Sequence, residues 1–131
     1  MNCELCDADG GAVLWRDDFC RVVRPEIEGY PGFLRVIVNR HVKEMTDLAE
    51  RGRLMQVVFA CESALRKLYN PDKVNLASLG NVVPHLHWHV IARFADDAHF
   101  PDAIWAPARR AAPPRAAVAN DALARAIMAA L

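Results

Sequence analysis

Short apolar runs lie in two regions of the chain, and turn-forming residues separate one run from the next. The runs are rich in the β-branched and aromatic residues that pack well in strands. The expected strands are residues 12–15, 19–23, 33–38, 73–79 and 86–94. Because a Gly80–Asn81 turn separates the last two runs and short turns separate the first three, we expect an antiparallel sheet of about five strands.

Between these two regions the hydrophobic period becomes that of a helix. The apolar positions that fall near one helical stripe are Leu48, Met55, Val58, Leu65 and Leu68. They predict one long helix from Asp47 to Tyr69, which Pro71 ends because proline lacks the N–H that a helix interior needs. An alanine-rich stretch at residues 116–130 predicts a short C-terminal helix. The predicted fold class is therefore α+β, with the long helix against the sheet.

Length and composition exclude several classes of protein. The 131 residues fit one domain. Lys plus Arg and Asp plus Glu both number 16, so we expect no broad basic surface for extended nucleic acid. No apolar run approaches the ~20 residues of a membrane-spanning helix, and the first residues do not resemble a secretion signal. Four cysteines are too few for a disulfide scaffold, so we expect a reducing, cytoplasmic setting.

Three of the five histidines, His85, His87 and His89, occupy alternate positions of the last predicted strand. Pro84 favours an extended residue before it and suits the start of a strand, so the strand should begin close to His85. Alternation sends the three imidazoles to one face, roughly 7 Å apart, and Leu86, Trp88 and Val90 to the other. A single histidine here would be a structural residue, but three in register predict a functional site.

Two kinds of chemistry suit this row. Alternate imidazoles on a strand can bind a divalent metal that activates water. A neutral imidazole can instead attack phosphorus, because an ordinary pKa near ~6.5 leaves much of it unprotonated at pH 7. The attack on phosphorus needs a phosphate site nearby, and Gly80 with Asn81 provides a turn whose N–H groups can bind anionic oxygens. We therefore favour the nucleophile.

The segment His85-Leu86-His87-Trp88-His89-Val90-Ile91 resembles the signature of the histidine triad (HIT) family, in which three histidines alternate with apolar residues. Residues 36–41 and 46–48 also resemble the family, so the resemblance spans about residues 3–94. It implies a HIT-like domain at residues 1–106. The Pro/Ala-rich residues 107–131, with the terminal helix, are then either part of that domain or mobile.

This resemblance implies a nucleotide hydrolase or nucleotidyl transferase that acts at the α-phosphorus of a phosphoramidate or a dinucleoside polyphosphate. His87 is expected to form a covalent nucleotidyl intermediate, and His89 to contact the phosphate or the leaving group. The expected nucleotide-binding residues are Asn75, Asn81, Val82 and His89. The resemblance further implies a homodimer, and no metal is required for the attack. The rival functions are a nonenzymatic nucleotide-binding module and a metal-dependent hydrolase that uses the histidine row as ligands.

One position departs from the family pattern. Many members carry a histidine where this chain has Phe33, at the start of the third predicted strand. A role of that histidine in substrate binding or proton transfer cannot be assigned to Phe33. The chemistry at His87 does not depend on that histidine, whereas the preference for one leaving group over another can depend on it.

Cys3 and Cys6 form a C-x-x-C pair, which alone fits packing residues, a redox pair or half of a zinc site. A closed zinc site needs four Cys or His ligands. Some members of the wider triad superfamily complete such a site with a later histidine and the first triad histidine. Here these are His41 and His85, so the resemblance implies a structural zinc site. The alternative is a pair of reduced thiols, with His85 kept in the active-site row.

Three further residues have less specific patterns. We expect His99 to face solvent, because it lies in an irregular polar stretch. Trp105 lies in a loop flanked by prolines and should pack as an ordinary aromatic residue, although it could reach a nucleotide base or a partner subunit. Arg93 shares a strand face with His87 by parity, and either screening of phosphate charge or a surface role is compatible with that position.

Overall fold

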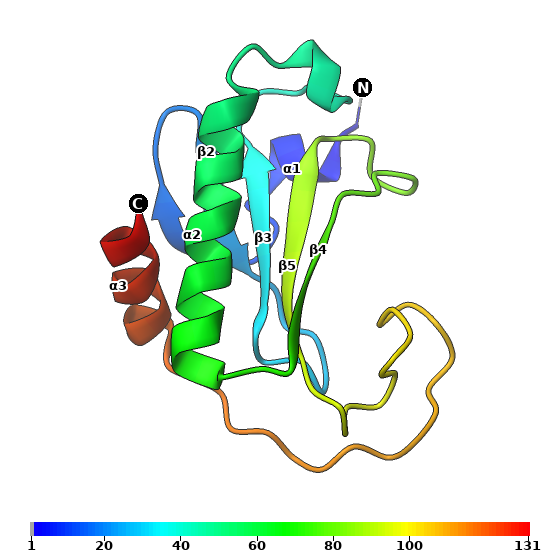
Figure 1. Cartoon of the computed structure of the whole chain (residues 1–131). Coiled ribbons are helices and arrows are strands. Elements are labelled where there is room, and N and C mark those ends of the chain that lie inside the picture. The colour runs from blue at the N-terminus through cyan, green and yellow to red at the C-terminus, as the bar shows by residue number, and fades with distance from the viewer. Residues whose placement is uncertain (1) are drawn as a thin grey trace.

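The computed structural model describes residues 2–131, which form one five-stranded antiparallel sheet and its covering helices (Figure 1). The strand order across the sheet is β1-β2-β3-β5-β4. The strands are β1 (Ala12–Arg16), β2 (Cys20–Arg24), β3 (Phe33–Val38), β4 (Lys73–Ala77) and β5 (His87–Arg93). The helices are α1 (Glu4–Asp7), the 3-10 turn η1 (Met45–Asp47), α2 (Arg51–Tyr69) and α3 (Asn120–Ala130). The predicted α+β fold class is confirmed.

The long helix begins four residues later than the sequence predicts. Glu44 and Asp47 form a capping box that closes the single turn η1, and Leu48 behind it is extended. This local pairing gives residues 45–47 their own hydrogen bonds, so α2 begins only at Arg51. Its end is as expected, because Asn70 adopts the left-handed conformation and donates its N–H to the Arg66 carbonyl just before Pro71.

Helices cover one face of the sheet. The buried side of α2 packs on strands β3 and β5, and α3 lies beside α2 with Leu123 and Ile127 fully buried in the same core (Figure 1). Trp88 and Val90 of β5, and Leu86 just before it, lie on this face, as the alternation predicts. The histidines therefore lie on the face that α2 and α3 leave free.

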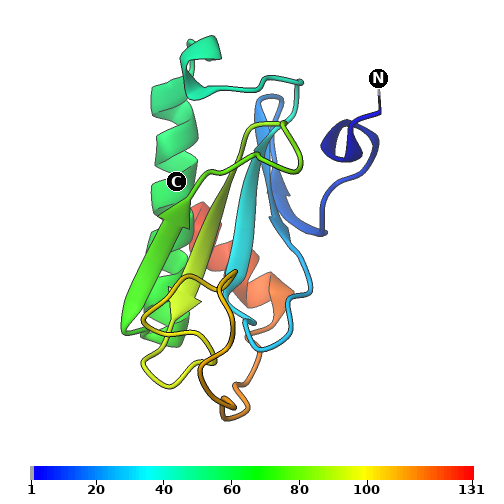
Figure 2. The same ribbon diagram turned by 90° about the vertical axis from the view of Figure 1, so that its right-hand side faces the viewer.

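Residues 2–11, here called the N-terminal arm, lie on this second face (Figure 2). Leu5 packs in a small buried cluster with Val23 and Ile37. The buried Arg21 holds the arm by donating to the carbonyl oxygens of Leu5, Ala8 and Asp9. Gly10 has a φ of 89°, and a Cβ atom there would lie 2.9 Å from Leu5, so glycine permits this close approach.

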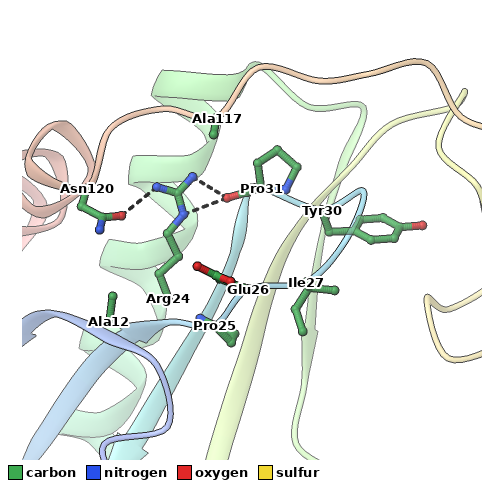
Figure 3. Close-up of a pocket in the computed structure, with 9 residues that line it drawn as sticks. All are labelled: Ala12, Arg24, Pro25, Glu26, Ile27, Tyr30, Pro31, Ala117 and Asn120. Atoms are coloured by element: carbon green, nitrogen blue, oxygen red, sulfur yellow. Dashed lines mark hydrogen bonds between the residues drawn. The ribbon is translucent and has the colours of Figure 1, made fainter.

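The C-terminal part of the chain is fixed to the sheet by a second arginine. Arg24, at the end of β2, donates to the carbonyl of Pro31 and to the Val118 carbonyl and Asn120 side chain that precede and begin α3 (Figure 3). A cavity of about 280 Å³ lies beside it, and no histidine lines this cavity. Within residues 2–131, no helix is both long and apolar enough to cross a membrane.

Candidate functional site

The pairing of β5 with β3 and β4 sets the positions of the histidine row, meaning His85, His87 and His89. Opposite His87 and His89 on β3 are Ile37 and Arg35. The row is largely covered: His85 is 0% exposed, His87 8% and His89 7%. A buried imidazole needs hydrogen-bond partners or carries a desolvation cost, so the partners of each ring show what it is positioned to do.

His87 is held in one tautomer by its own strand. Its Nδ1 lies 2.5 Å from the carbonyl oxygen of His85. A carbonyl only accepts, so Nδ1 carries the proton and Nε2 carries the lone pair. This arrangement leaves a nucleophilic nitrogen on a ring whose orientation is fixed.

His89 lies among rings and has an incomplete set of hydrogen bonds. Its ring centroid is 5.0 Å from that of His87, 5.3 Å from that of Phe33 and 5.2 Å from that of Trp105. Its Nδ1 is buried and has no hydrogen-bond partner within residues 2–131. Burial, with the nearby His87 and Arg35, lowers the pKa of His89 to about 4. The ring is therefore neutral at pH 7.

His85 turns away from the other two and joins the N-terminal arm. Its Nε2 donates to the Val38 carbonyl at 2.6 Å, which leaves Nδ1 as the acceptor. That Nδ1 lies 3.3 Å from the Cys3 sulfur and 3.4 Å from the Cys6 sulfur. His41 Nδ1 lies 3.4 Å from the Cys6 sulfur, and the four ligand atoms all lie within 4.8 Å of one another. All four cysteines are free thiols.

The donor set of this Cys/His cluster fits one zinc ion. Two sulfurs and two imidazole nitrogens are the ligands of closed tetrahedral zinc sites. The Val38 carbonyl fixes the orientation of the His85 ring, as second partners of metal-bound histidines commonly do. Burial lowers the pKa of His85, which keeps its ring in the neutral form that binds metal.

The loop before β5, residues 78–84 and here called the Gly80 loop, is joined to the backbone of His87 through Ser78. Gly80 has a φ of 71°, and the Ser78 hydroxyl donates to the His87 carbonyl at 2.8 Å. Within residues 2–131, neither the Asn81 nor the Val82 N–H donates to a protein acceptor, and Val82 is 93% exposed. A cavity of about 350 Å³ beside this loop is lined by Leu86, Trp88 and Met45 as well as Gly80, so it opens on the helix-covered side of the sheet and not on the imidazole side.

Asn75 lies further along the same face of the sheet. Its register partner on β5 is Ile91, two residues past His89. Its side-chain oxygen already accepts a hydrogen bond from Arg93 at 2.7 Å. The structure therefore brings His89 into contact with His87 and places Asn75 toward the Arg93 end of β5, whereas Val82 lies beside Cys3 and His41.

Neither interpretation of Arg93 from the sequence agrees with its environment. Arg93 is 2% exposed and pairs with Asp97 through Nε at 2.8 Å. It also donates to Asn75 and to the Asp102 carbonyl. The arginine is therefore a saturated structural residue, and its parity with His87 alone could not show this because Asp97 and Asp102 lie outside the strand.

Two expectations for the segment after β5 are wrong. His99 is partly buried rather than solvent-facing, and its Nδ1 is 2.6 Å from the Tyr30 hydroxyl, which also donates to Asp97. Trp105 is 51% exposed and contacts His89 instead of packing in the core. The Arg93–Asp97 pair and the Asp102 carbonyl hold this segment over the histidine face, so Trp105 borders the row.

One residue that sequence reasoning passed over also faces the row. Arg35 lies on β3 opposite His89, with its guanidinium carbon 5.9 Å from the centroid of the Phe33 ring. The signal in the sequence was a charged residue inside an otherwise apolar strand. Its importance depends on the pairing of β3 with β5, which the linear pattern did not reveal.

The sheet order and the alternating histidines of β5 define a class of α+β domains built around a histidine-bearing inner strand. A family model described as the HIT domain matches residues 10–96, which is more than half of the chain. The chain therefore belongs to the HIT family, as its resemblance to the triad signature predicted. No match is found among curated proteins.

Solved structures agree with this assignment. A histidine triad protein from Bradyrhizobium japonicum is 29% identical, with 91% of this chain and 92% of that chain covered and a TM-score of 0.74. A HIT protein from Sinorhizobium meliloti 1021 is 25% identical over 100% of this chain and 96% of its own, with a TM-score of 0.75. A HIT family protein from Bacillus anthracis is 25% identical over 80% and 82%, with a TM-score of 0.67.

Proposed function

We propose that this protein is a nucleotide hydrolase or nucleotidyl transferase in which His87 attacks the α-phosphorus of a nucleotide conjugate. The observation that carries the proposal is the hydrogen bond from His87 Nδ1 to the His85 carbonyl, which leaves the Nε2 lone pair available for attack. Family membership supports the same class of reaction. The tautomer and the fixed orientation of the ring both suit a nucleophile.

The reaction proceeds in two displacements. In the first, the Nε2 lone pair forms a bond to phosphorus, the bond between phosphorus and the leaving group breaks, and the leaving group takes the electron pair. The ring then carries a positive charge, which the His85 carbonyl stabilises by accepting the Nδ1–H bond. In the second, water attacks phosphorus, the bond to Nε2 breaks with its electrons returning to nitrogen, and a nucleoside monophosphate and a proton are released.

Other residues bind the substrate in this proposal. The N–H groups of Asn81 and Val82 donate to the α-phosphate oxygens, because the protein offers them no other acceptor within residues 2–131. His89, neutral at pH 7, contacts the phosphate or the leaving group. The Asn75 side-chain oxygen already accepts from Arg93, so Asn75 contributes to the nucleotide pocket only if its amide bonds to the nucleotide and to Arg93 together.

The placement of the ligands disfavours a hydrolase that uses the row to hold a catalytic metal. Among residues 2–131, the group of side chains that can hold a metal contains His85 but neither His87 nor His89. We propose that this Cys/His cluster binds one structural zinc ion through Cys3, Cys6, His41 and His85. Thiols that bind metal must stay reduced, which suits a cytoplasmic location.

We also propose a homodimer. β4 is an edge strand of the sheet and presents an exposed Leu76, with Leu79 exposed just beyond its end. An unpaired strand edge with apolar side chains can pair with a second copy about a twofold axis. Sedimentation of the wild-type protein against a Leu76→Lys variant tests this, and a monomer in both contradicts it.

The function is tested with His87→Ala and His87→Gly, and with His99→Gln as a control histidine outside the row. Adenosine 5′-phosphoramidate and a dinucleoside polyphosphate serve as substrates. Both His87 variants should bind nucleotide and lose turnover by ~10³-fold or more, while the control keeps its rate. Mass spectrometry of the quenched wild-type reaction should find one nucleotidyl group on residue 87. Full turnover by either His87 variant contradicts the proposal, and nucleotide binding without wild-type turnover favours a nonenzymatic module.

A further inference from the structure

Arg35 brings a positive charge to the site that the proposed chemistry at His87 does not use. It lies in the middle of β3, opposite His89 and on the same face of the sheet as the histidine row. Its guanidinium lies over the ring of Phe33, and that ring contacts His89. Arg35 is therefore level with His89, two residues along β5 from His87, which is roughly 7 Å along the strand.

The hydrogen bonds of Arg35 are largely unmade. Nη1 donates to the Gly10 carbonyl at 3.0 Å. Nε is buried without a partner, and Nη2 donates to no acceptor within residues 2–131. No carboxylate in this part of the chain lies within ion-pair distance of the guanidinium, although seven other arginines make such pairs.

Three other covered arginines have a fuller set of hydrogen bonds. Arg21 uses all three of its nitrogens on carbonyls and on Asn39. Arg24 does the same with Pro31, Val118 and Tyr69. Arg93 has a full set that includes a carboxylate. Arg35 alone among these four keeps donors without acceptors, so its environment suits a partner that is not part of the chain.

Glu4 of the N-terminal arm is the acidic side chain that acts on the charge of Arg35, but it does not reach ion-pair distance. A partly buried guanidinium without a paired carboxylate is costly for the folded protein, and such costs are retained where they serve binding. Arginine stays charged even when burial lowers its pKa, as it does here. His89 supplies a second unmade hydrogen bond beside it, since its Nδ1 is buried without a partner. Two neighbouring polar groups that lack partners, one of them a cation, indicate a ligand that is an anion.

We propose that Arg35 determines leaving-group specificity by binding the phosphate next to the one attacked, so that the site prefers phosphoanhydrides over phosphoramidates. This inference rests on the proposed function of His87. In a phosphoanhydride the leaving group is itself a phosphate, and its negative charge grows as the bond to the α-phosphorus breaks. A fixed guanidinium at this position stabilises that charge in the transition state.

The protonation of the neighbours supports this choice between substrate classes. An amine leaving group has to gain a proton as it departs, whereas a phosphate departs as a stable anion. Arg35 cannot act as an acid at neutral pH. His89, with its lowered pKa, is a neutral imidazole there and no strong acid either. Phe33 brings no ionisable group to the same corner of the site.

The test compares kcat/KM of the wild type and of Arg35→Gln on diadenosine triphosphate and on adenosine 5′-phosphoramidate. Losing a charge-assisted hydrogen bond should lower kcat/KM for the polyphosphate ~10- to 100-fold and for the phosphoramidate less than ~3-fold.

Two control variants separate the charge of Arg35 from other effects. Arg35→Lys keeps the charge and should recover part of the loss. Arg66→Gln, which removes the same charge from an exposed position on α2, should leave both rates unchanged. Equal losses on both substrates, or none on the polyphosphate, overturn the inference and leave the proposed function intact.

A binding measurement keeps the inference testable if the wild type turns over neither substrate, a result that overturns the proposed function instead. Calorimetry with AMP and ADP on His87→Ala, and on His87→Ala combined with Arg35→Gln, isolates the contact to the second phosphate. ADP should bind ~10-fold more tightly than AMP only when Arg35 is present. An equal preference in both proteins contradicts the role of Arg35, and thermal melting of each variant confirms that it is folded.

Discussion

The two ends of one face of β5 carry similar polar groups in opposite states. At the far end, Arg93 is buried with every nitrogen hydrogen-bonded, and Asp97 accepts from Arg93, from Tyr30 and from three backbone N–H groups. At the near end, His89 keeps a nitrogen without a partner and Arg35 keeps two such donors within the described chain. His89 is buried as Arg93 is, and Arg35 is partly buried, so burial alone does not separate the two ends.

The difference is the completeness of the hydrogen bonding. A buried polar cluster whose members are all satisfied holds the structure together, and here it fixes the segment that carries Trp105. A buried cluster with unmade bonds stays costly until a ligand completes it. The saturated end therefore positions the site, and the unsaturated end is the place where we expect a ligand to bind. The predictions below test this division, beginning with the largest expected effect.

Breaking the saturated end should cost the most stability. Asp97→Ala leaves the Arg93 guanidinium buried without its carboxylate, so the free energy of unfolding should fall by about 3–5 kcal/mol. Urea unfolding followed by fluorescence measures this. Asp102→Asn removes the carboxylate of an exposed pair with Arg109 and should have a far smaller effect. Similar losses in the two variants would show that the Arg93 cluster is not special.

Zinc should give each of the four ligand atoms of the Cys/His cluster a bonding partner. At several hundred times the dissociation constant, bound zinc should stabilise the fold by about 3 kcal/mol. Protein prepared with zinc should contain one ion per chain, and Cys6→Ser should lose both the ion and the stabilisation. Cys61→Ala, which changes a buried thiol elsewhere, should keep the ion. A reduced wild-type protein that binds no zinc contradicts the proposal.

Acid should reveal the unsaturated end through His89. The pKa of this ring is about 4 in the folded protein and ordinarily near ~6.5 in an unfolded chain, so between these values only the unfolded chain gains the proton. Stability should therefore be complete above pH 6.5 and fall as the pH decreases toward 4, by about 2 kcal/mol at pH 5. His89→Asn should lack this part of the loss when unfolding is measured at pH 7.5 and pH 5. An identical pH slope in both proteins would refute the assignment.

The smallest effect on stability and activity is expected at Trp105, which lies between the two ends. Trp105 is half exposed and its ring contacts His89, so Trp105→Ala should leave the melting temperature nearly unchanged. It should raise KM ~3- to 10-fold, because an aromatic contact contributes about 0.5–1.5 kcal/mol. Trp105→Phe should keep most of the affinity. A lower kcat with an unchanged KM would instead place Trp105 among the groups that act on the transition state.

Patterns within one segment predicted most of the fold. The two-residue period of β5 separated the histidines from Leu86 and Trp88, and the helical stripe identified α2. The missed start of α2 has a local cause, the capping box between Glu44 and Asp47, which a hydrophobic stripe does not report. Pattern analysis detects buried faces better than it detects the hydrogen bonds that end an element.

The site was harder to predict wherever it depends on contacts between distant segments. From the sequence, Cys3, Cys6, His41 and His85 could meet only if the N-terminal arm folds over the sheet, as the family resemblance implied, and the structure brings their ligand atoms within 4.8 Å. Arg35 meets His89 because β3 pairs with β5, and Arg93 is neutralised by Asp97 from the following loop. His99 and Trp105 were misjudged for the same reason, since one bonds to Tyr30 and the other contacts His89.

The strict alternation along β5 makes this protein far more sensitive to a change in chain length than to a change of residue. Deleting one amino acid between Pro84 and His87 would rotate every later side chain of the strand by half a turn unless the loop absorbs the change. The imidazoles would then be driven into the apolar core under α2, and the indole of Trp88 would take their place on the opposite face of the sheet. Single-codon insertions or deletions here should therefore be far less tolerated than most point substitutions in the same stretch.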